Sequence, residues 1–299
     1  GAYSACVANG INWFDTAELY GRGRSERILG GLVNGRGRES GRELGDNSDS
    51  PKPLIATKFF PYPWRVHRWS FRRALEASLR RLNTDSIDLY QTHFPYRPRS
   101  FKYWVDALAD AAQDGLIMAV GVSNYSAEQT KRAHEILDRR GLVLASNQIG
   151  YSLLNRKLEG DLFEFARRFG LGVMAYSPLA IGLLAATYSD DSDRDTRALW
   201  RERLGDRLGE VLTDDVRRVK SEVDRIAEKR EASPAEVAIA WVLNNEAVTV
   251  AIAGPDTPDQ LSDYVNAVDL GLEASELKTL DDASQASDSL IGEWQLPRV

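Results

Sequence analysis

Short runs of apolar and β-branched residues alternate with longer amphipathic stretches along most of the chain. Each short run has the length of a buried strand, and each amphipathic stretch, about 10 to 18 residues long, has the length of a surface helix. Strands that alternate with helices form a parallel sheet, because each helix returns the chain to begin the next strand in the same direction. The pattern predicts seven strands, at residues 11–15, 54–58, 87–92, 118–123, 145–149, 172–176 and 248–253.

Several of the expected helices begin with a recognisable signal. Ser126 with Gln129, and Ser233 with Glu236, have the spacing of a capping box, in which each side chain accepts a hydrogen bond from the other residue's backbone N–H. Thr257 stands directly before a proline and predicts a third such start. These signals place helices between the predicted strands, as the alternation requires.

A parallel sheet with a helix after each strand fits a TIM (β/α)8 barrel, but the predicted strands are one short of a closed barrel. The first ten residues, GAYSACVANG, resemble the end of a helix that leads into the first visible strand, so we expect that a preceding strand is missing. Either the sequence is a fragment or the barrel is open on one side, and we favour the fragment. We expect residues 1–299 to form a single barrel domain, with loop excursions at 34–53 and 185–213.

Composition excludes several classes of protein. The net charge is −6 and no block of Lys and Arg contains interleaved aromatic residues, so we expect no nucleic-acid partner. The single cysteine, Cys6, excludes an internal disulfide and a cysteine metal cluster, which fits a reducing compartment. No apolar run approaches the ~18 residues of a membrane span, and no signal peptide is evident. We therefore expect a cytoplasmic protein with no membrane partner and no bound metal.

Four titratable residues stand at or directly after the ends of the first three predicted strands. Asp15 ends the first strand, and Lys58 ends the second. His93 follows the third strand, and Tyr20 lies in the loop after the first. The C-terminal ends of barrel strands meet on one rim, so we expect these side chains to converge there. Each residue alone has an ordinary explanation, such as a solvated lysine or a structural histidine, but the set of four indicates an active site.

The four side chains suit the protonation of a carbonyl oxygen. A tyrosine, whose ordinary pKa is about 10, donates its proton poorly at neutral pH unless a nearby cation stabilises the phenolate. Lys58 can supply that cation, and Asp15 can hold the ammonium in place. His93 can orient the carbonyl or relay a proton. Tyr20 would then protonate an oxygen on which negative charge develops, which suits carbonyl reduction beside a hydride donor.

Motifs throughout the chain make it similar to the aldo-keto reductase superfamily, close to the branch that includes potassium-channel β-subunits. They are GINWFDTAELYG (10–21), IATKF (55–59), SIDLYQTHFP (86–95), GLIMAVGVSNYS (115–126), NQIGYSLLNR (147–156), GVMAYSPLAIGLL (172–184) and PAEVAIAWVL (234–243). The resemblance implies a TIM barrel and a nicotinamide cofactor, NADPH or NADH, extended across the strand ends. It also implies a catalytic tetrad of Asp15, Tyr20, Lys58 and His93, with Tyr20 as the general acid.

The same resemblance implies which residues bind the cofactor. Ser123, Asn124 and Gln148 would hold the nicotinamide carboxamide, and Tyr176 would stack on the nicotinamide ring. The family's pyrophosphate loop corresponds to Ser177, Pro178, Leu179 and Gly182, and the segment at the adenosine end contains Gly254, Thr257, Gln260 and Tyr264. Backbone N–H groups in the loop and near Thr257 could bind the phosphates.

Segment 251–267, AIAGPDTPDQLSDYVNA, departs from the family pattern. The family usually has Lys or Arg here to bind the 2′-phosphate of NADPH, and a Glu-Asn pair for the adenine. This segment contains neither, since Asp263 and Tyr264 replace the pair, and Asp256 would repel a phosphate. We therefore expect NADH to be accepted comparably or preferred, unless arginines from elsewhere hold NADPH.

Aromatic residues near the rim are expected to line the substrate pocket, although each could equally be a core residue. They are Trp13, Phe60, Trp64, Phe94 and Tyr125. An aromatic rim suggests a small or medium-sized aldehyde or ketone as the substrate, and the predicted activity is an oxidoreductase that transfers a hydride from NAD(P)H to that carbonyl. Two alternatives stay open: a cofactor-binding regulatory subunit like the channel β-subunits, with weak or no turnover, and an inactive fragment. No oligomeric state is predicted.

Overall fold

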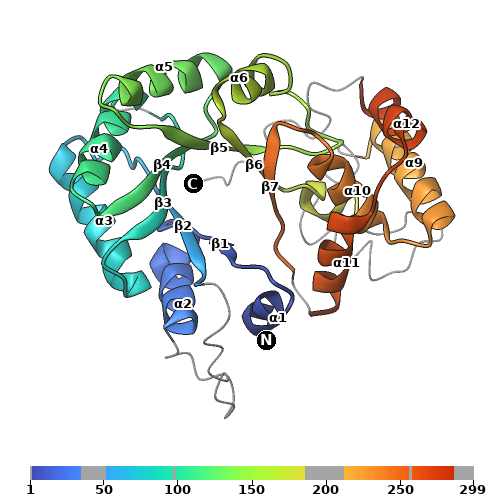
Figure 1. Ribbon diagram of the computed structural model, residues 1–299, viewed down its shortest axis with the longest axis horizontal. Helices are drawn as coiled ribbons and strands as arrows, with labels where there is room; N and C mark the ends of the chain where they lie inside the picture. The colour runs from blue at the N-terminus through green and yellow to red at the C-terminus, as the bar shows by residue number, and fades with distance from the viewer. Residues whose placement is uncertain (1, 35–51, 97–98, 186–211, 256–257, 286–299) are drawn as a thin grey trace, which may run out of the picture. The chain divides into compact units, whose positions relative to one another are not determined.

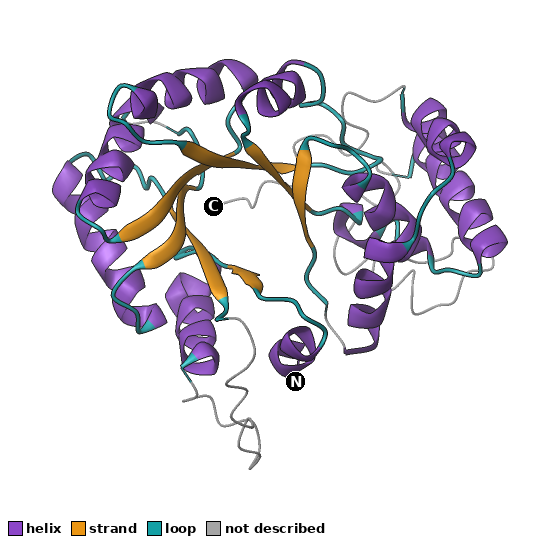
Figure 2. Ribbon diagram, viewed as in Figure 1, coloured by secondary structure: helices purple, strands orange, loops and turns teal. Residues whose placement is uncertain are grey.

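The computed structural model describes residues 2–34, 52–96, 99–185, 212–255 and 258–285, which divide into two compact units. The first unit is formed by Gly1–Gln148 and Glu164–Gly172, and the second by Ile149–Phe163 and Val173–Val299. Figure 1 labels the elements of both units, and Figure 2 colours them by type. The prediction of one domain over residues 1–299 stays a prediction.

Five strands that begin in the first unit pair in parallel, in the order in which they occur in the sequence. They are β1 (Trp13–Asp15), β2 (Leu54–Phe59), β3 (Ile87–Thr92), β4 (Ile117–Ser123) and β5 (Leu144–Gly150). The register aligns Lys58 with Gln91, Gln91 with Gly121, and Gly121 with Ser146. Since aligned residues point to the same side of a sheet, these positions form one row across its inner face.

Gly121 is required in that row because its neighbours lie over it. A Cβ atom there would come within 2.6 Å of Ser146 Oγ and 2.8 Å of Gln91 Cγ. These distances are below van der Waals contact, so a larger residue in β4 would displace two buried side chains. The glycine thus lets polar side chains from β3 and β5 cover the inner face of β4.

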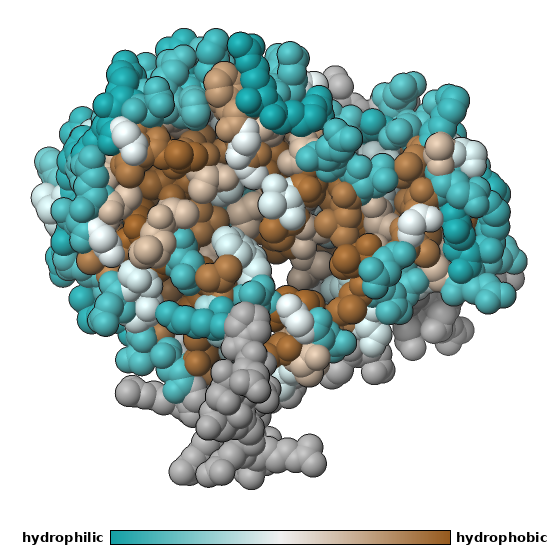
Figure 3. Space-filling view, in the orientation of Figure 1, coloured by the Kyte–Doolittle hydropathy of each residue, from teal (hydrophilic) through white to brown (hydrophobic). Residues whose placement is uncertain are grey.

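Helices cover the outer face of these strands. They are α1 (Ala2–Ala8), α2 (Arg24–Val33), α3 (Arg68–Leu82), α4 (Phe101–Gln113), α5 (Ala127–Asp138) and α6 (Asp161–Phe169). The division between the two units passes through α6. The ring of Phe59 in β2 has its centroid 4.9 Å from those of Phe71 in α3 and Trp104 in α4. All three rings are buried, so this packing fixes the helices on the sheet. On the face drawn in Figure 3, hydrophilic residues cover the outer helices α3 to α5 and hydrophobic residues gather over the strands.

Two strands and a set of helices are described in the second unit. Strands β6 (Gly172–Tyr176) and β7 (Val248–Ile252) pair in parallel, with Tyr176 aligned with Ile252. The helical elements are η2 (Ala180–Gly182), α9 (Asp214–Arg230), α10 (Pro234–Leu243), α11 (Pro258–Asp269) and α12 (Ala274–Ser284). Arg156 bonds Glu159 twice, donates to Ser284 Oγ at 2.8 Å, and lies 5.2 Å from the Trp241 ring centroid. One guanidinium therefore joins the loop after β5 to α10 and α12.

The structure confirms all seven predicted strands, with bounds that differ from the prediction by at most two residues. The largest difference is at β1, which begins at Trp13 rather than at residue 11, although the carbonyl of Asn12 still accepts from the backbone N–H of Leu54 at 2.7 Å. The capping boxes at Ser126 and Ser233 are confirmed. Most of the two predicted loop excursions, residues 35–51 and 186–211, lies outside the described residues, as does Thr257. None of the described helices combines the length and apolar composition of a membrane span.

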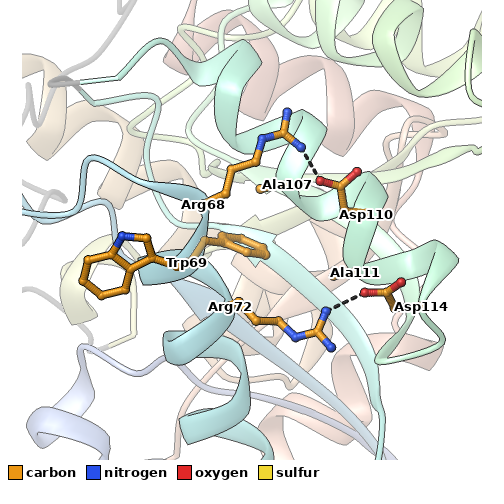
Figure 4. A pocket seen from close by; sticks show the side chains of 8 residues that line it. Arg68, Trp69, Arg72, Ala107, Asp110, Ala111 and Asp114 are labelled. Carbon is orange, nitrogen blue, oxygen red and sulfur yellow. Dashed lines mark hydrogen bonds and ion pairs between the residues drawn. The ribbon is translucent and has the colours of Figure 1, made fainter.

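A surface groove lies between α3 and α4, on the outer helical layer (Figure 4). Arg68 on α3 pairs with Asp110 on α4, and Arg72 on α3 pairs with Asp114, the C-cap residue of α4. Trp69 stands beside them with 61% of its surface exposed. Both ion pairs are formed by half-exposed side chains, so each contributes little to stability. The groove lies among the outer helices, whereas the predicted catalytic residues come from strand ends.

One carboxylate of the first unit is buried and paired on both sides. Glu26 in α2 has no exposed surface; Thr57 in β2 donates to its Oε1 at 2.8 Å, and Arg81 in α3 donates to its Oε2 at 2.6 Å. These bonds join one helix to a strand and to the next helix. Removing the carboxylate would leave both donors without their buried partner.

We expect Glu26→Ala to lower the free energy of unfolding by about 3 kcal/mol, because it breaks a buried ion pair. The matched control is Glu76→Ala, which removes an exposed carboxylate paired with Arg72 within α3 and should cost less than about 0.5 kcal/mol. Urea denaturation of both variants measures the difference. Equal losses would contradict this account of Glu26.

Candidate active site

A buried ion pair between Lys58 and Asp15 lies at the end of the first two strands. The Lys58 side chain has no exposed surface, and its Nζ lies 2.5 Å from Asp15 Oδ2. The same nitrogen donates to the carbonyl oxygen of Thr16 at 2.8 Å. An isolated ammonium would be very unfavourable here, so the carboxylate and the carbonyl replace the water that it loses on burial.

The chain after β1 stays attached to β2, and this attachment determines where Tyr20 lies. Thr16 donates its backbone N–H to Ala56 at 2.8 Å, and Glu18 donates to the carbonyl of Lys58 at 3.3 Å. The short helix η1 (Tyr20–Gly23) then turns the chain away. Gly23 has a φ of 81°, which only glycine adopts without strain, and a Cβ there would lie 2.6 Å from the Arg81 side chain. Tyr20 is thus fixed at the start of a tight turn beside the strand ends.

Tyr20 and His93 lie next to the ion pair. Lys58 Nζ is 5.3 Å from the centroid of the Tyr20 ring, and the rings of Tyr20 and His93 meet edge to face with centroids 5.8 Å apart. Tyr20 is 39% exposed, whereas His93 is 4% exposed. The structure therefore brings the four predicted residues together in the first unit, with the tyrosine facing solvent and the lysine sealed behind it.

His93 is neutral at physiological pH. Its burial, and secondarily the nearby charge of Lys58, lower its pKa from 6.5 to about 3. Its backbone is fixed at both polar groups, since the N–H donates to the carbonyl of Phe59 at 2.9 Å and the carbonyl accepts from Asn124 Nδ2 at 3.1 Å. A neutral imidazole has one donor and one acceptor nitrogen, so it can offer a hydrogen bond without adding charge.

The residues predicted to bind a carboxamide adjoin the ion pair. Gln148 Nε2 donates to Asp15 Oδ1 at 2.9 Å. The backbone carbonyl of Gln148 accepts from Ser123 Oγ and from the N–H of Asn124, both at 2.9 Å. Asn124 adopts a positive φ of 61°, an unfavourable conformation that this bond helps to hold. These three polar residues thus form one connected group with Asp15.

The other predicted cofactor-binding residues that the structure describes lie in the second unit. Thr257 lies outside the described residues. Tyr176 ends β6, and its carbonyl accepts from the N–H of Tyr151 at 3.2 Å. In the loop after it, Ser177, Ala180 and Ile181 have positive φ values of 53°, 49° and 62°. The remaining predicted residues are Pro178, Leu179 and Gly182 in this loop, Gly254 after β7, and Gln260 and Tyr264 on α11. Three strained residues within five positions are typical of a loop whose shape serves a ligand.

The five predicted pocket residues differ in their surroundings. Phe94 stacks on His93 with centroids 4.7 Å apart, and Phe60 meets His93 edge-on at 5.8 Å. Trp64 is 72% exposed and stacks on Tyr62 rather than on the tetrad. Two others are more enclosed: Trp13 is half-buried on β1, and Tyr125 is fully buried with its hydroxyl bonded to that of Thr92. Phe60 and Phe94 are therefore the predicted pocket residues in contact with the tetrad.

A second ion pair near the tetrad was not predicted from the sequence. Arg65 contacts both carboxylate oxygens of Glu18, and Glu18 Oε1 also accepts from the N–H of Phe60 at 2.6 Å. Arg65 donates in addition to the Phe60 carbonyl at 2.8 Å. The pair fixes the loop after β2, and no local pattern indicates it because 47 residues separate its members. Among the described residues, no group of three or more His, Cys, Asp or Glu could hold a metal ion.

Because the folded protein keeps His93 neutral, its stability should fall as the pH drops from about 6.5 towards about 3, the interval in which only the unfolded chain binds this proton. Between pH 7 and 5.5, His93 should remove about 1.3 kcal/mol of stability. Urea denaturation at both pH values should show a loss in the wild type that exceeds the loss in His93→Asn by this amount. An equal loss in the two proteins would show that the histidine can be protonated in the fold.

Comparison with known proteins relates both units to one family. The aldo/keto reductase family matches residues 2–285. "Pyridoxal reductase, chloroplastic" of Arabidopsis thaliana is 32% identical over 295 residues, which cover 96% of this chain and 76% of that protein. "Probable voltage-gated potassium channel subunit beta", also of Arabidopsis thaliana, is 30% identical over 273 residues, which cover 89% of this chain and 80% of that protein.

A solved structure extends the comparison to the fold. The thermostable aldo-keto reductase Tm1743, in complex with the inhibitor epalrestat, matches with a TM-score of 0.71 and 26% identity over 94% of this chain and 85% of that chain. The fold is therefore a TIM barrel, in agreement with the alternation of strands and helices. With its match over residues 2–285, the chain belongs to the aldo/keto reductase family.

Proposed function

We propose that this protein reduces small aldehydes or ketones with a nicotinamide cofactor, and that Tyr20 is the general acid. The observation that supports this most directly is the buried Lys58–Asp15 pair beside the Tyr20 ring, with neutral His93 at the ring's edge. Relatives named as oxidoreductases, among them pyridoxal reductase, support the same class of reaction.

In the proposed reaction, the residues of the tetrad neutralise the negative charge that develops on the carbonyl oxygen. When bound, the reduced nicotinamide supplies the two electrons and the hydrogen that the carbonyl carbon gains. Tyr20 donates its phenolic proton to the oxygen, and the Lys58 ammonium stabilises the phenolate that is left. Asp15 holds the ammonium in place through the buried ion pair. Neutral His93 donates a hydrogen bond that orients the carbonyl before the proton moves.

The polar groups around Asp15 fit a nicotinamide carboxamide. Since Gln148 Nε2 donates to Asp15, its amide oxygen remains to accept from a carboxamide N–H. Ser123 and Asn124 adjoin Gln148 through its backbone carbonyl. We assign the carboxamide to these three residues. We assign the nicotinamide ring to Tyr176, the pyrophosphate to the strained loop that begins at Ser177, and the adenosine to the segment around Gly254, Gln260 and Tyr264.

The aromatic surroundings of His93 favour a planar carbonyl substrate. Phe60 and Phe94 contact the imidazole, and Trp64 extends the aromatic surface through its stack on Tyr62 at 4.6 Å. Aromatic side chains stack well on other flat rings. The similarity to pyridoxal reductase, a protein named for a heteroaromatic aldehyde, agrees with this choice. Aromatic aldehydes are therefore the class that we propose as substrates.

We expect Tyr20→Phe to lower kcat/KM for 4-nitrobenzaldehyde by at least about 100-fold, because the substitution removes the proton donor and little else. The Kd for the cofactor should change little. Tyr103→Phe is the matched control, since Tyr103 lies on α4 against Trp104 and the variant should retain wild-type rates. Oxidation of NADPH or NADH, followed by absorbance, measures both variants. Full activity in Tyr20→Phe would contradict the assignment.

The similarity to channel β-subunits favours one other function, a regulatory subunit that binds the cofactor with little turnover. The two proposals differ in a simple measurement. An oxidoreductase turns over at least one aldehyde in a panel of aromatic and aliphatic substrates, whereas a regulatory subunit binds the cofactor without turnover of any of them.

We expect NADPH and NADH to bind with Kd values within tenfold of each other, because segment 251–267 contains no Lys or Arg to bind the 2′-phosphate. Gln260→Arg places a cation on α11 and should tighten NADPH, but not NADH, by about tenfold. Ser275→Arg is the control, which adds the same charge to the exposed start of α12. Fluorescence quenching measures each Kd. Wild-type binding of NADPH more than tenfold tighter than that of NADH would show that other cations hold the phosphate.

A further inference from the structure

We infer that Gln148 positions the general acid Tyr20 by holding Asp15, and through it Lys58, in addition to its contact with the cofactor. This inference rests on the proposed function, since it assigns a part in the proton-transfer step to a residue that the family resemblance connects only with the carboxamide.

The two oxygens of the Asp15 carboxylate are bound by different residues. Oδ2 lies 2.5 Å from Lys58 Nζ, and Oδ1 accepts from Gln148 Nε2 at 2.9 Å. Gln148 is 3% exposed, and the Asp15 and Lys58 side chains are 8% and 0% exposed. A hydrogen bond in such a dry environment is stronger than in water, because little solvent competes for either partner.

Gln148 is well placed to hold the carboxylate because its own backbone is fixed. It lies in β5, aligned with Ser123 in β4, and its carbonyl accepts two hydrogen bonds from Ser123 and Asn124. Asp15 is in β1, 133 residues earlier in the sequence, and three strands lie between β1 and β5 in the pairing order. The amide therefore connects two strands that do not pair with each other, across the inner face of the sheet.

Loss of this hydrogen bond would reach Tyr20 through Lys58. Without the amide, Asp15 Oδ1 would be buried without a donor, and the carboxylate would be free to turn about its own bonds. Lys58 would follow the carboxylate, because its Nζ has Thr16 as its one other acceptor among the described residues. Among the residues that the structure describes, the charged and titratable groups that face the Tyr20 ring are Lys58 and His93, and His93 is neutral. Glu18 lies in the same loop but is paired with Arg65. The position of Lys58 thus determines the electrostatic field at the phenol.

Leucine substitution at two buried glutamines tests the inference. Gln148→Leu removes the amide that bonds Asp15. Gln91→Leu is the matched control, because Gln91 is also fully buried on the inner face, is aligned with Lys58, and has no hydrogen-bond partner for either amide atom among the described residues. The readout is the single-turnover rate of aldehyde reduction at saturating cofactor between pH 6 and 10, which reports the chemical step rather than product release.

We expect Gln148→Leu to slow the single-turnover rate about tenfold and to move the alkaline fall of the rate upward by at least about half a pH unit, because a less firmly held ammonium stabilises the phenolate less. Gln91→Leu should leave the alkaline fall where it is in the wild type. A residue that only binds the carboxamide would give a different result, namely a higher KM for the cofactor with the rate and its pH profile unchanged at saturation.

Gln148→Glu provides a second test that does not depend on the leucine variant folding. A protonated glutamic acid can donate to Asp15 Oδ1 as the amide does, whereas an ionised one repels it. We expect the ratio of the Gln148→Glu rate to the wild-type rate to fall between pH 6 and pH 9. A constant ratio of these two rates across this range would overturn the inference.

The outcomes separate the two proposals. Wild-type turnover that depends on Tyr20, combined with an unchanged pH profile in Gln148→Leu, would overturn the positioning role and leave the proposed function intact. Absence of turnover in the wild type would overturn both.

Discussion

The first unit is organised around one buried cation. The Lys58 ammonium has no contact with water, so the fold must supply its acceptors, and it does so from the chain at the end of β1. That requirement keeps β1 beside β2 and continues their pairing beyond the last residue of β1, through Thr16 and Glu18. The turn that follows then brings Tyr20 next to the same cation. The position of Tyr20 is thus a consequence of how the protein supplies hydrogen-bond acceptors to Lys58.

The residues of strand β2 alternate between two environments, the helix-covered outer face of the sheet and its polar inner face. Its outward residues meet the helices: Thr57 bonds the buried Glu26, and the Phe59 ring packs against α3 and α4. Lys58 lies between them and points to the inner face, where the aligned positions are Gln91, Gly121 and Ser146. Hydrophobic packing outside therefore supports a polar inner row. The favourable packing of the helices on the outer face offsets the free-energy cost of burying polar side chains on the inner face.

The sequence indicated the strands, the helix starts at Ser126 and Ser233 and the convergence of the tetrad, because each follows from a local pattern or from the rule that barrel strands end on one rim. The start of β1 was misjudged by two residues, since the apolar Ile11 continues the pattern without joining the strand. The Glu18–Arg65 pair and the Gln148–Asp15 bond were not foreseen, because they join residues 47 and 133 positions apart. Tyr125 shows a different limit: an aromatic residue after a strand end can face a pocket or, as here, be wholly buried with its hydroxyl bonded inside.

The unequal exposure of the tetrad has a consequence for how the site would recover after each reaction. His93 holds no surplus proton at neutral pH, and Lys58 is closed off from water. Tyr20, with 39% of its surface exposed, is the most solvent-exposed member of the four. In the proposed cycle the phenolate would regain its proton from bulk water across the mouth of the site, where the substrate had been. The alcohol product would then leave before Tyr20 is reprotonated. The unequal exposure of the four side chains would determine the order of these two events.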